Sequence, residues 1–206
     1  YLAFLIPIAS RVLALGCGDG STLGRLDVSY GLGVDSSEIN IELGNQRFSN
    51  CQYMQGDIED PTLLCSLINK GPFDVILLED TLGYLEDIEK FLKQIKPLCS
   101  HNTRIISVYY GYLWEPLLTL AEILRVRKPS LDTTWLRMAD VENFMTLSGF
   151  EVVKKEWRIL SPFRFLGIGS FINRYIATLP VIRKFCLRHF VVARMIPDQQ
   201  SIPQSV

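Results

Sequence analysis

This chain has few histidines, and its cysteines do not lie close together in the sequence. It contains two histidines, His101 and His189, which are too few for a histidine-rich zinc or iron site, so we expect no metal. The five cysteines are scattered, odd in number and without a Cys-x-x-Cys pair. A disulfide framework is therefore not expected, and reduced thiols in a cytoplasmic protein are the simplest interpretation.

A charge excess and long apolar runs are also lacking. The chain has 21 Lys and Arg against 22 Asp and Glu, and it shows no groove-reading motif, so we expect no nucleic-acid partner. The longest apolar candidate, residues 163–182, is interrupted by Arg164 and Arg174, which argues against a transmembrane helix. No secretory signal is visible. Residues 1–8 are apolar and do not begin with Met, and we expect the end of a helix before the first strand, in a segment of a longer chain.

The most informative stretch that is present covers residues 11–20. The apolar run Val12–Leu15 predicts a short buried parallel strand. A glycine-rich turn follows, made of Gly16, Cys17, Gly18, Asp19 and Gly20. Ser21 is a candidate N-cap, and residues 22–26 are expected to open a helix. Strand, glycine turn and helix start are typical of a nucleotide-binding corner, and a plain tight turn after a strand is the alternative.

The glycine spacing indicates which nucleotide is bound. The pattern G-x-G-x-G differs from the dinucleotide fingerprint G-x-G-x-x-G, because the sixth position is Ser21. A pyrophosphate needs several free N–H groups at a helix start. A shorter glycine set with Asp19 in its middle fits a cofactor that has no phosphate and a cationic end, as S-adenosylmethionine does. A nicotinamide oxidoreductase is the alternative, disfavoured by this spacing and by the lack of an evident Tyr-x-x-x-Lys or histidine proton donor.

Three further predicted strands each end at a carboxylate. Asp35, next to Ser36, ends a strand about twenty residues after the first glycine, where an acid binds ribose hydroxyls in doubly wound folds. Asp57 and Ile58 follow the next strand, where the acid can accept from the adenine amine and the apolar side chain can pack on the adenine ring. Glu79 and Asp80 follow the strand after that. Any one of these acids could be a solvated loop residue, but together they predict one crevice. The candidate cofactor-binding residues are Gly16, Cys17, Gly18, Asp19, Gly20, Asp35, Ser36, Asp57, Ile58, Glu79 and Asp80.

The order of the predicted elements indicates an α/β fold. Strands are expected near residues 11–15, 30–35, 51–55, 73–78 and 103–109. Helices alternate with them near residues 21–26, 37–48, 61–70, 86–96 and 114–126. This alternation predicts a Rossmann-like, doubly wound, parallel sheet with helices on both faces. A helix over 139–147, ended by Gly149, and strands over 151–158 and 190–195 complete the chain.

Five segments resemble the motifs of class I S-adenosylmethionine-dependent methyltransferases. They are residues 12–20, Asp35, residues 56–58, residues 73–87 and residues 148–153. The resemblance covers nearly all of the chain and implies a seven-stranded, mostly parallel sheet with an antiparallel edge formed by the last two strands. It departs at Ala14, where an acid is common in the family, and at Gly83-Tyr84, where many members carry histidine.

The resemblance also bears on catalysis. It puts Glu79, Asp80 and Tyr84 nearest the methyl group, so these are the catalytic candidates, although binding of the cofactor's amino group is the favoured role for Asp80. The missing histidine removes an obvious base. A non-catalytic subunit that keeps the fold therefore stays an alternative, and metal-dependent, catechol-type transfer is disfavoured.

Two regions are candidates for the acceptor site. The first, residues 109–135, gathers aromatic side chains at the end of strand five, some of which are expected only to cap the core. The second, residues 161–187, lies in a stretch without any acid. Its seven basic residues from 157 to 196 are Arg158, Arg164, Arg174, Arg183, Lys184, Arg188 and Arg194. Since the net charge of the chain is −1, the remainder carries −8. This asymmetry fits an acidic or phosphorylated acceptor or peripheral contact with an anionic membrane; arginines paired with acids elsewhere are the alternative.

We expect one methyltransferase domain over residues 1–196, with residues 159–188 as a helical, basic and aromatic cover between strands six and seven. Residues 197–206 are polar with two prolines, and we expect a disordered tail. Residues 110–116, 134–136 and 173–180 resemble, more loosely, a bacterial subgroup in which such a domain is joined to a glycosyltransferase. That resemblance implies a small-molecule, sugar, glycan or glycolipid acceptor.

Overall fold

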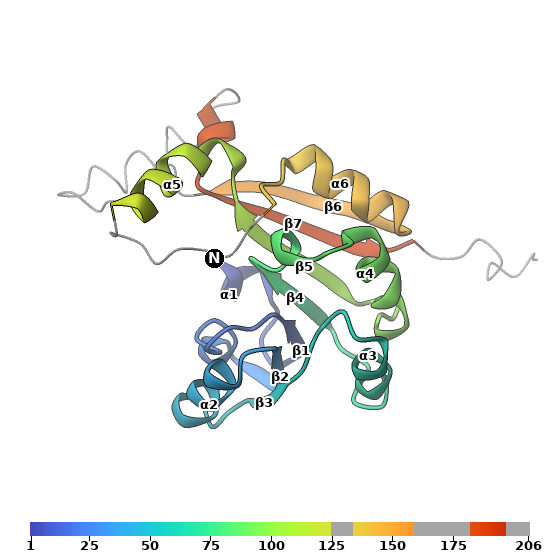
Figure 1. Cartoon of the computed structure of the whole chain (residues 1–206). Helices are drawn as coiled ribbons and strands as arrows, with labels where there is room; N and C mark the ends of the chain where they lie inside the picture. The colour runs from blue at the N-terminus through green and yellow to red at the C-terminus, as the bar shows by residue number, and fades with distance from the viewer. Residues whose placement is uncertain (125–133, 159–181, 197–206) are drawn as a thin grey trace, which may run out of the picture.

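The strands of the chain form one seven-stranded sheet in the computed structural model, which describes residues 1–124, 134–158 and 182–196 (Figure 1). The strands are β1 (Ser10–Leu15), β2 (Val28–Asp35), β3 (Gln52–Gln55), β4 (Val75–Glu79), β5 (Arg104–Tyr110), β6 (Phe150–Arg158) and β7 (Arg188–Met195). Their spatial order is β3-β2-β1-β4-β5-β7-β6. β1 to β5 pair in parallel, and β7 runs antiparallel to both β5 and β6. The predicted Rossmann-like sheet with an antiparallel edge is confirmed. β7 lies between β5 and β6, so β6 is the edge strand.

Helices cover both faces of this sheet (Figure 1). They are α1 (Leu2–Leu5), α2 (Glu38–Arg47), α3 (Pro61–Ile68), α4 (Ile88–Gln94), α5 (Glu115–Ile123) and α6 (Met138–Leu147). Successive residues of β1 point to opposite faces, as a strand requires. Leu13 and Leu15 pack in the core under α3, α4 and α6, whereas Val12 and Ala14 pack in the core shared with α1 and α2. Burial of β1 on both faces explains its unbroken apolar sequence.

The sheet topology determines where a ligand can bind. From β1 the chain first moves to one side, through β2 and β3, and then returns to β4 on the other side of β1. Ligands in such sheets bind outside the carboxyl ends of the strands at this reversal. Three helices begin beside these strand ends, and their N-caps Ser37, Asp60 and Asp87 each accept a backbone N–H from two or three residues further on.

The predicted helix over residues 21–26 is wrong. The chain there makes only one 3-10 turn, Leu23–Arg25, before β2 starts. Gly24 lies against the Phe48 ring, and a Cβ on it would come within 2.2 Å of that ring. A glycine has low helix propensity, and only twelve residues separate β1 from β2, so this crossover cannot hold a regular helix.

Several other expectations concern the ends of elements. α1 precedes β1, as expected, and Tyr1 packs edge-on against Phe190 with ring centroids 5.0 Å apart. Gly149 follows α6 with a φ of +81°, which is the expected helix end. Most of the predicted cover, residues 159–181, and the predicted tail, residues 197–206, lie outside the described residues. Within the described ranges, no helix combines the length and apolar character needed to cross a bilayer.

Candidate functional site

A cleft of about 700 Å³ lies at the carboxyl ends of β1 to β4. Its volume is within the range of small-molecule and cofactor sites. The walls come from the segments that follow β1, β2, β3 and β4. Nine of the twelve predicted catalytic or cofactor-binding positions line it, namely Gly16, Gly18, Asp35, Ser36, Asp57, Ile58, Glu79, Asp80 and Tyr84. The structure therefore gathers these residues in one place, and their individual roles stay predictions.

The glycine loop brings the backbone to the cleft. Gly16 and Gly18 have φ values of +72° and +54°, in the left-handed region that favours glycine. A Cβ on Gly16 would lie 2.8 Å from Oγ1 of the buried Thr81, whose hydroxyl donates to the Leu15 carbonyl at 2.8 Å. A Cβ on Gly18 would meet nothing within 4 Å. Gly16 is therefore required for packing between β1 and β4, whereas Gly18 leaves open space for a ligand.

Asp35 is held firmly at the end of β2. Its Oδ2 accepts the Gly18 N–H at 2.8 Å, and its Oδ1 accepts from the Ser37 N–H and from Asn40 Nδ2, both at 3.0 Å. A carboxylate offers about four lone pairs, so acceptor capacity remains for a ligand hydroxyl. Ser37 and Asn40, which also line the cleft, were missed by the sequence analysis. Their position in the first turn of α2, just after Asp35, is the signal that could have found them.

The end of β3 contributes Asp57, Ile58 and Glu59. Asp57 Oδ1 accepts the Glu59 N–H at 2.9 Å, which fixes a tight turn. Glu59 accepts from the segment just before α4, because both of its carboxylate oxygens lie 3.2 Å from the Glu86 backbone nitrogen. Ile58 is half-buried against the core. A carboxylate beside an apolar side chain suits one edge and one face of a heterocyclic base.

The end of β4 carries an ion-pair cluster. Asp80 Oδ1 pairs with Arg188 Nη1, and Glu79 Oε1 lies 3.3 Å from Arg188 Nη2. The Arg188 guanidinium also lies over the Tyr110 ring, 4.2 Å from its centroid. Burial opposes the charge on Arg188, but its bonds and charge pairing with Asp80, Tyr110 and Glu79 outweigh burial and raise its pKa. Arg188 therefore stays a cation at every physiological pH.

Arg188 is the functional residue that sequence reasoning placed least well. It appeared only as one of seven basic residues in the expected cover. The structure places it at the start of β7, opposite Tyr110 in the antiparallel register with β5. No local signal joins residue 188 to residues 79 and 80, because only the sheet topology brings them together.

Three predicted cofactor residues do not line the cleft. Asp19 pairs with Arg47 Nη1 at 2.8 Å and accepts the Ser21 N–H at 3.1 Å, so its carboxylate is engaged outside the cleft, and its expected role toward a cationic ligand stays a prediction. The Cys17 thiol lies beside Gly33 of β2, and burial raises its pKa to about 12. Gly20 packs under the Tyr53 ring. These three residues contact other parts of the protein and do not line the cleft.

Tyr84 lines the cleft, whereas the aromatic residues at the end of β5 and just after it are not among the lining residues. Tyr84, on the 3-10 turn Leu82–Tyr84, is 47% exposed and lines the cleft. Tyr109 is buried in the core, which agrees with the alternative of a capping role. Tyr110, Tyr112 and Trp114 are half-buried, and Trp114 Nε1 donates to the Phe185 carbonyl at 2.7 Å.

His189 lies next to this group on β7. Its ring packs edge-on against Tyr109 and Trp157, with centroids 5.5 and 6.4 Å apart. It is only 3% exposed, and among the described residues neither ring nitrogen has a hydrogen-bond partner. Burial lowers the pKa of His189 to about 4, so the ring is neutral at physiological pH.

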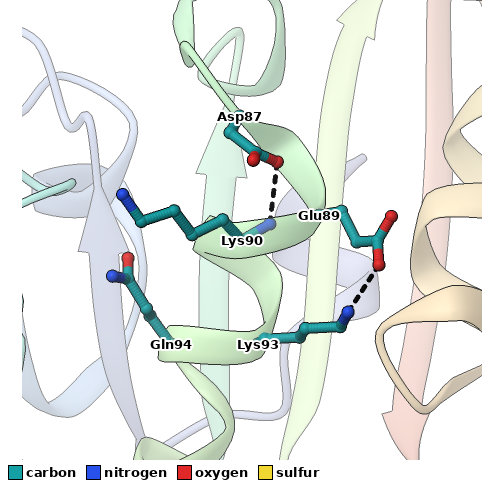
Figure 2. Close-up of a pocket in the computed structure, with 5 residues that line it drawn as sticks. All are labelled: Asp87, Glu89, Lys90, Lys93 and Gln94. Carbon is teal, nitrogen blue, oxygen red and sulfur yellow. Dashed lines mark hydrogen bonds and ion pairs between the residues drawn. The ribbon is translucent and has the colours of Figure 1, made fainter.

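A second hollow, of about 550 Å³, lies along α4 (Figure 2). Its lining side chains come from one helix and its N-cap, and two local contacts join them. Glu89 pairs with Lys93, and Asp87 accepts the Lys90 N–H at 2.9 Å. This hollow is a solvated helix face and is not a candidate site. No group of three His, Cys, Asp or Glu within the described ranges is arranged to hold a metal ion.

The charge of the main cleft decides what it can bind. Five of its described lining residues carry carboxylates, and no described lining residue is basic. The five acids are Asp35, Asp57, Glu59, Glu79 and Asp80. Even with Arg188 beside it, the cleft is strongly negative, which disfavours a pyrophosphate and suits a nucleoside that carries a positive charge.

Comparisons with known proteins identify the family and the fold. The family model described as "Methyltransferase domain" matches residues 9–147. A search of curated protein sequences found no match. An S-adenosylmethionine-dependent methyltransferase from Thermotoga maritima superposes with a TM-score of 0.66 at 17% identity, covering 95% of this chain and 86% of its own.

Two further solved structures are similar. A methyltransferase of the same cofactor class from Mesorhizobium loti gives a TM-score of 0.65 at 15% identity, covering 94% of this chain and 95% of its own. Magnesium protoporphyrin IX methyltransferase from Synechocystis, with S-adenosylhomocysteine bound, gives 0.59 at 16% identity, covering 95% of this chain and 78% of its own. At these identities the structural matches support the fold, and the family model carries the assignment.

Proposed function

This chain belongs to the methyltransferase-domain family, and on that premise we propose that it methylates a neutral small molecule or glycan, with a sugar-containing acceptor as the leading candidate. It is a class I S-adenosylmethionine-dependent methyltransferase, and S-adenosylmethionine is its cofactor. The nature of the acceptor is the proposal.

The residues present fit this cofactor. Asp35 is held by three donors and would accept from the ribose hydroxyls, while Asp57 and Ile58 would bind the adenine. Gly16 and Gly18 let the methionine part lie against the backbone, and Glu79 and Asp80 would attract its ammonium group. When bound, the cofactor supplies an electrophilic methyl group on a positively charged sulfur.

The protein's own contribution is mainly positioning. An in-line displacement needs the acceptor atom opposite the sulfur and water excluded from the gap. Glu79 and Asp80 are each paired with Arg188, so one oxygen of each carboxylate is already engaged within the protein. We therefore assign both acids to cofactor binding and place Tyr84 on the acceptor side, where its hydroxyl would orient a nucleophile.

One observation carries the acceptor proposal: half-buried aromatic side chains stand at the end of β5, beside a strongly acidic cleft. One face of Tyr110 is covered by Arg188 and one face of Tyr112 by Arg137, and Trp114 Nε1 bonds the Phe185 carbonyl. The parts of these half-buried rings that stay exposed suit the apolar faces of a sugar ring. The acidic cleft disfavours a second anion close to the methyl group. An acidic or phosphorylated acceptor and contact with an anionic membrane remain the second candidates, supported by the seven basic residues between 157 and 196.

A radiolabelled methyl-transfer assay tests the acceptor. Matched pairs of acceptors would be offered, each a neutral sugar or glycolipid and its phosphorylated form, with the labelled cofactor. We expect transfer to the neutral member of a pair. Transfer only to phosphorylated members would favour the second candidate, and transfer only to non-sugar metabolites would refute the sugar proposal.

Calorimetry tests the alternatives at the level of function. We expect S-adenosylhomocysteine to bind and NAD and NADP not to bind. Cofactor binding without methyl transfer into any cell extract would favour the non-catalytic subunit. Joining to a glycosyltransferase in a longer chain is a further proposal, which the mass of the protein isolated from its source would check.

A further inference from the structure

Arg188 contacts both acids at the end of β4 from a strand that is more than one hundred residues away in the sequence. Its side chain is 18% exposed, and those of Glu79 and Asp80 are 25% and 31% exposed. The guanidinium rests on the Tyr110 ring, and the neighbouring Gly111 N–H donates to the Leu187 carbonyl at 2.9 Å. Arg188, at the start of β7, is therefore held in place by contacts with the end of β5.

The two acids would repel each other without this cation. They are adjacent in the sequence, and Asp80 has a φ of +55°, which is unusual for a residue with a side chain. Two like charges this close repel each other, and a cation that contacts both offsets this repulsion and holds their positions. Arg188 contributes one positive charge against two negative ones and leaves a net charge of −1.

The geometry leaves part of each carboxylate for a ligand. Arg188 takes Oε1 of Glu79 and Oδ1 of Asp80 through separate nitrogens. In the described part of the chain, the second oxygen of each acid has no protein donor. A planar guanidinium with five donors holds two acids in fixed directions, which a lysine ammonium cannot do.

We propose that Arg188 is a positioning residue for the cofactor: its two nitrogens hold Glu79 and Asp80 so that their second oxygens face the cationic end of S-adenosylmethionine. This inference rests on the proposed assignment of the two acids to cofactor binding. The other titratable groups around the pair are Tyr110, Tyr84, Asp35, Asp57 and Glu59. The three acids among them add to the negative field that Arg188 offsets.

The test is the affinity for S-adenosylhomocysteine, measured by calorimetry at pH 7.5. The variant is Arg188→Gln, and its matched control is Arg194→Gln. Arg194 lies on the same strand and pairs with Glu151 at 2.8 Å, but at the exposed opposite end of the sheet. Thermal unfolding of each variant reports on the fold separately.

We expect Arg188→Gln to weaken binding by roughly 10- to 100-fold at pH 7.5, the range for losing charge-assisted hydrogen bonds. Arg194→Gln should bind with wild-type affinity. Asp80→Asn should cost less affinity in the Arg188→Gln background than in the wild type, because the positioning of Asp80 by Arg188 is already lost there.

Wild-type affinity in a folded Arg188→Gln variant, or strictly additive losses in the double variant, would overturn the proposal. If Arg188→Gln does not fold, Arg188→Lys is measured, and a several-fold loss of affinity is required. Wild-type affinity in the lysine variant, or failure of both variants to fold, would assign Arg188 a purely structural role. Absence of binding in the wild type would instead refute the proposed function.

Discussion

Substitution of Gly18 separates ligand binding from folding more cleanly than any other change in the cleft. The structure places this residue in the wall of the cleft, with open space where a Cβ would stand. We expect Gly18→Arg to abolish binding of S-adenosylhomocysteine, with a loss of at least about 100-fold, or about 2.7 kcal/mol. The long side chain would enter the acidic cleft and pair with the carboxylates that the cofactor needs.

The cost to folding can be worked from the backbone. A residue with a Cβ pays about 1–2 kcal/mol for the left-handed conformation at a φ of +54°. Part of this is offset because a non-glycine residue restricts the unfolded chain, by about 0.4–1 kcal/mol. No steric cost is added at Gly18, so the free energy of unfolding should fall by about 1 kcal/mol. That is small beside the 5–15 kcal/mol typical of a domain.

Gly20→Ala is the matched comparison. Gly20 has a similar φ of +73°, but a Cβ there would lie 2.4 Å from Cε1 of Tyr53. The same backbone strain is then joined by overpacking, which adds about 1–3 kcal/mol. Urea unfolding of Gly18→Ala and Gly20→Ala, with calorimetry of Gly18→Arg, checks all three values. Unchanged affinity in Gly18→Arg, or equal stability of the two alanine variants, would refute this account of the loop.

Three further predictions concern Asp35, His189 and the cysteines. Asp35→Ala should weaken cofactor binding by about tenfold or more, because three donors and the ligand lose their acceptor, and should leave acceptor preference unchanged in methyl-transfer assays; a changed preference with normal affinity would count against the ribose role. Because burial lowers the pKa of His189 from 6.5 to about 4, the unfolded chain takes up a proton that the folded chain resists, and stability should fall by about 3 kcal/mol between pH 7 and pH 4 from this group. His189→Phe should remove that contribution without loss of stability at pH 7, as urea unfolding at several pH values would show; an unchanged slope would contradict the assignment. A thiol reagent at pH 8 should modify the exposed Cys65 and spare Cys17, whose pKa burial raises to about 12, and peptide mass mapping of rapid Cys17 labelling in the folded protein would disprove its burial.

The sequence predicted those features that depend on short-range patterns. The apolar runs that form β1 and β4 are bounded by glycine or acid, so their positions and the carboxylates at their ends could be read directly. Asp35 and Asp57 were found in this way, and both line the cleft. The order of strands and helices then restricted the topology to a parallel, doubly wound sheet.

Features that depend on distant partners were not predictable in this way. Asp19 does not line the cleft, and its carboxylate pairs with Arg47, which lies 28 residues later on α2. Arg188 reaches Asp80 only because β7 pairs with β5 in one particular register. The failed helix over residues 21–26 has the same origin, since Phe48 occupies the space beside Gly24.

The position of β7 has a consequence for how the protein reaches its native state. β7 is the last strand of the described residues, yet it lies between β5 and β6. A chain in which β7 has not yet paired leaves the hydrogen-bonding edges of both neighbours open, and such edges invite pairing with other molecules. Insertion of this one strand closes both edges and, in the same event, delivers the only guanidinium that contacts Glu79 and Asp80 within the described ranges. Protection from aggregation and competence to bind a ligand should therefore arise together, late in folding.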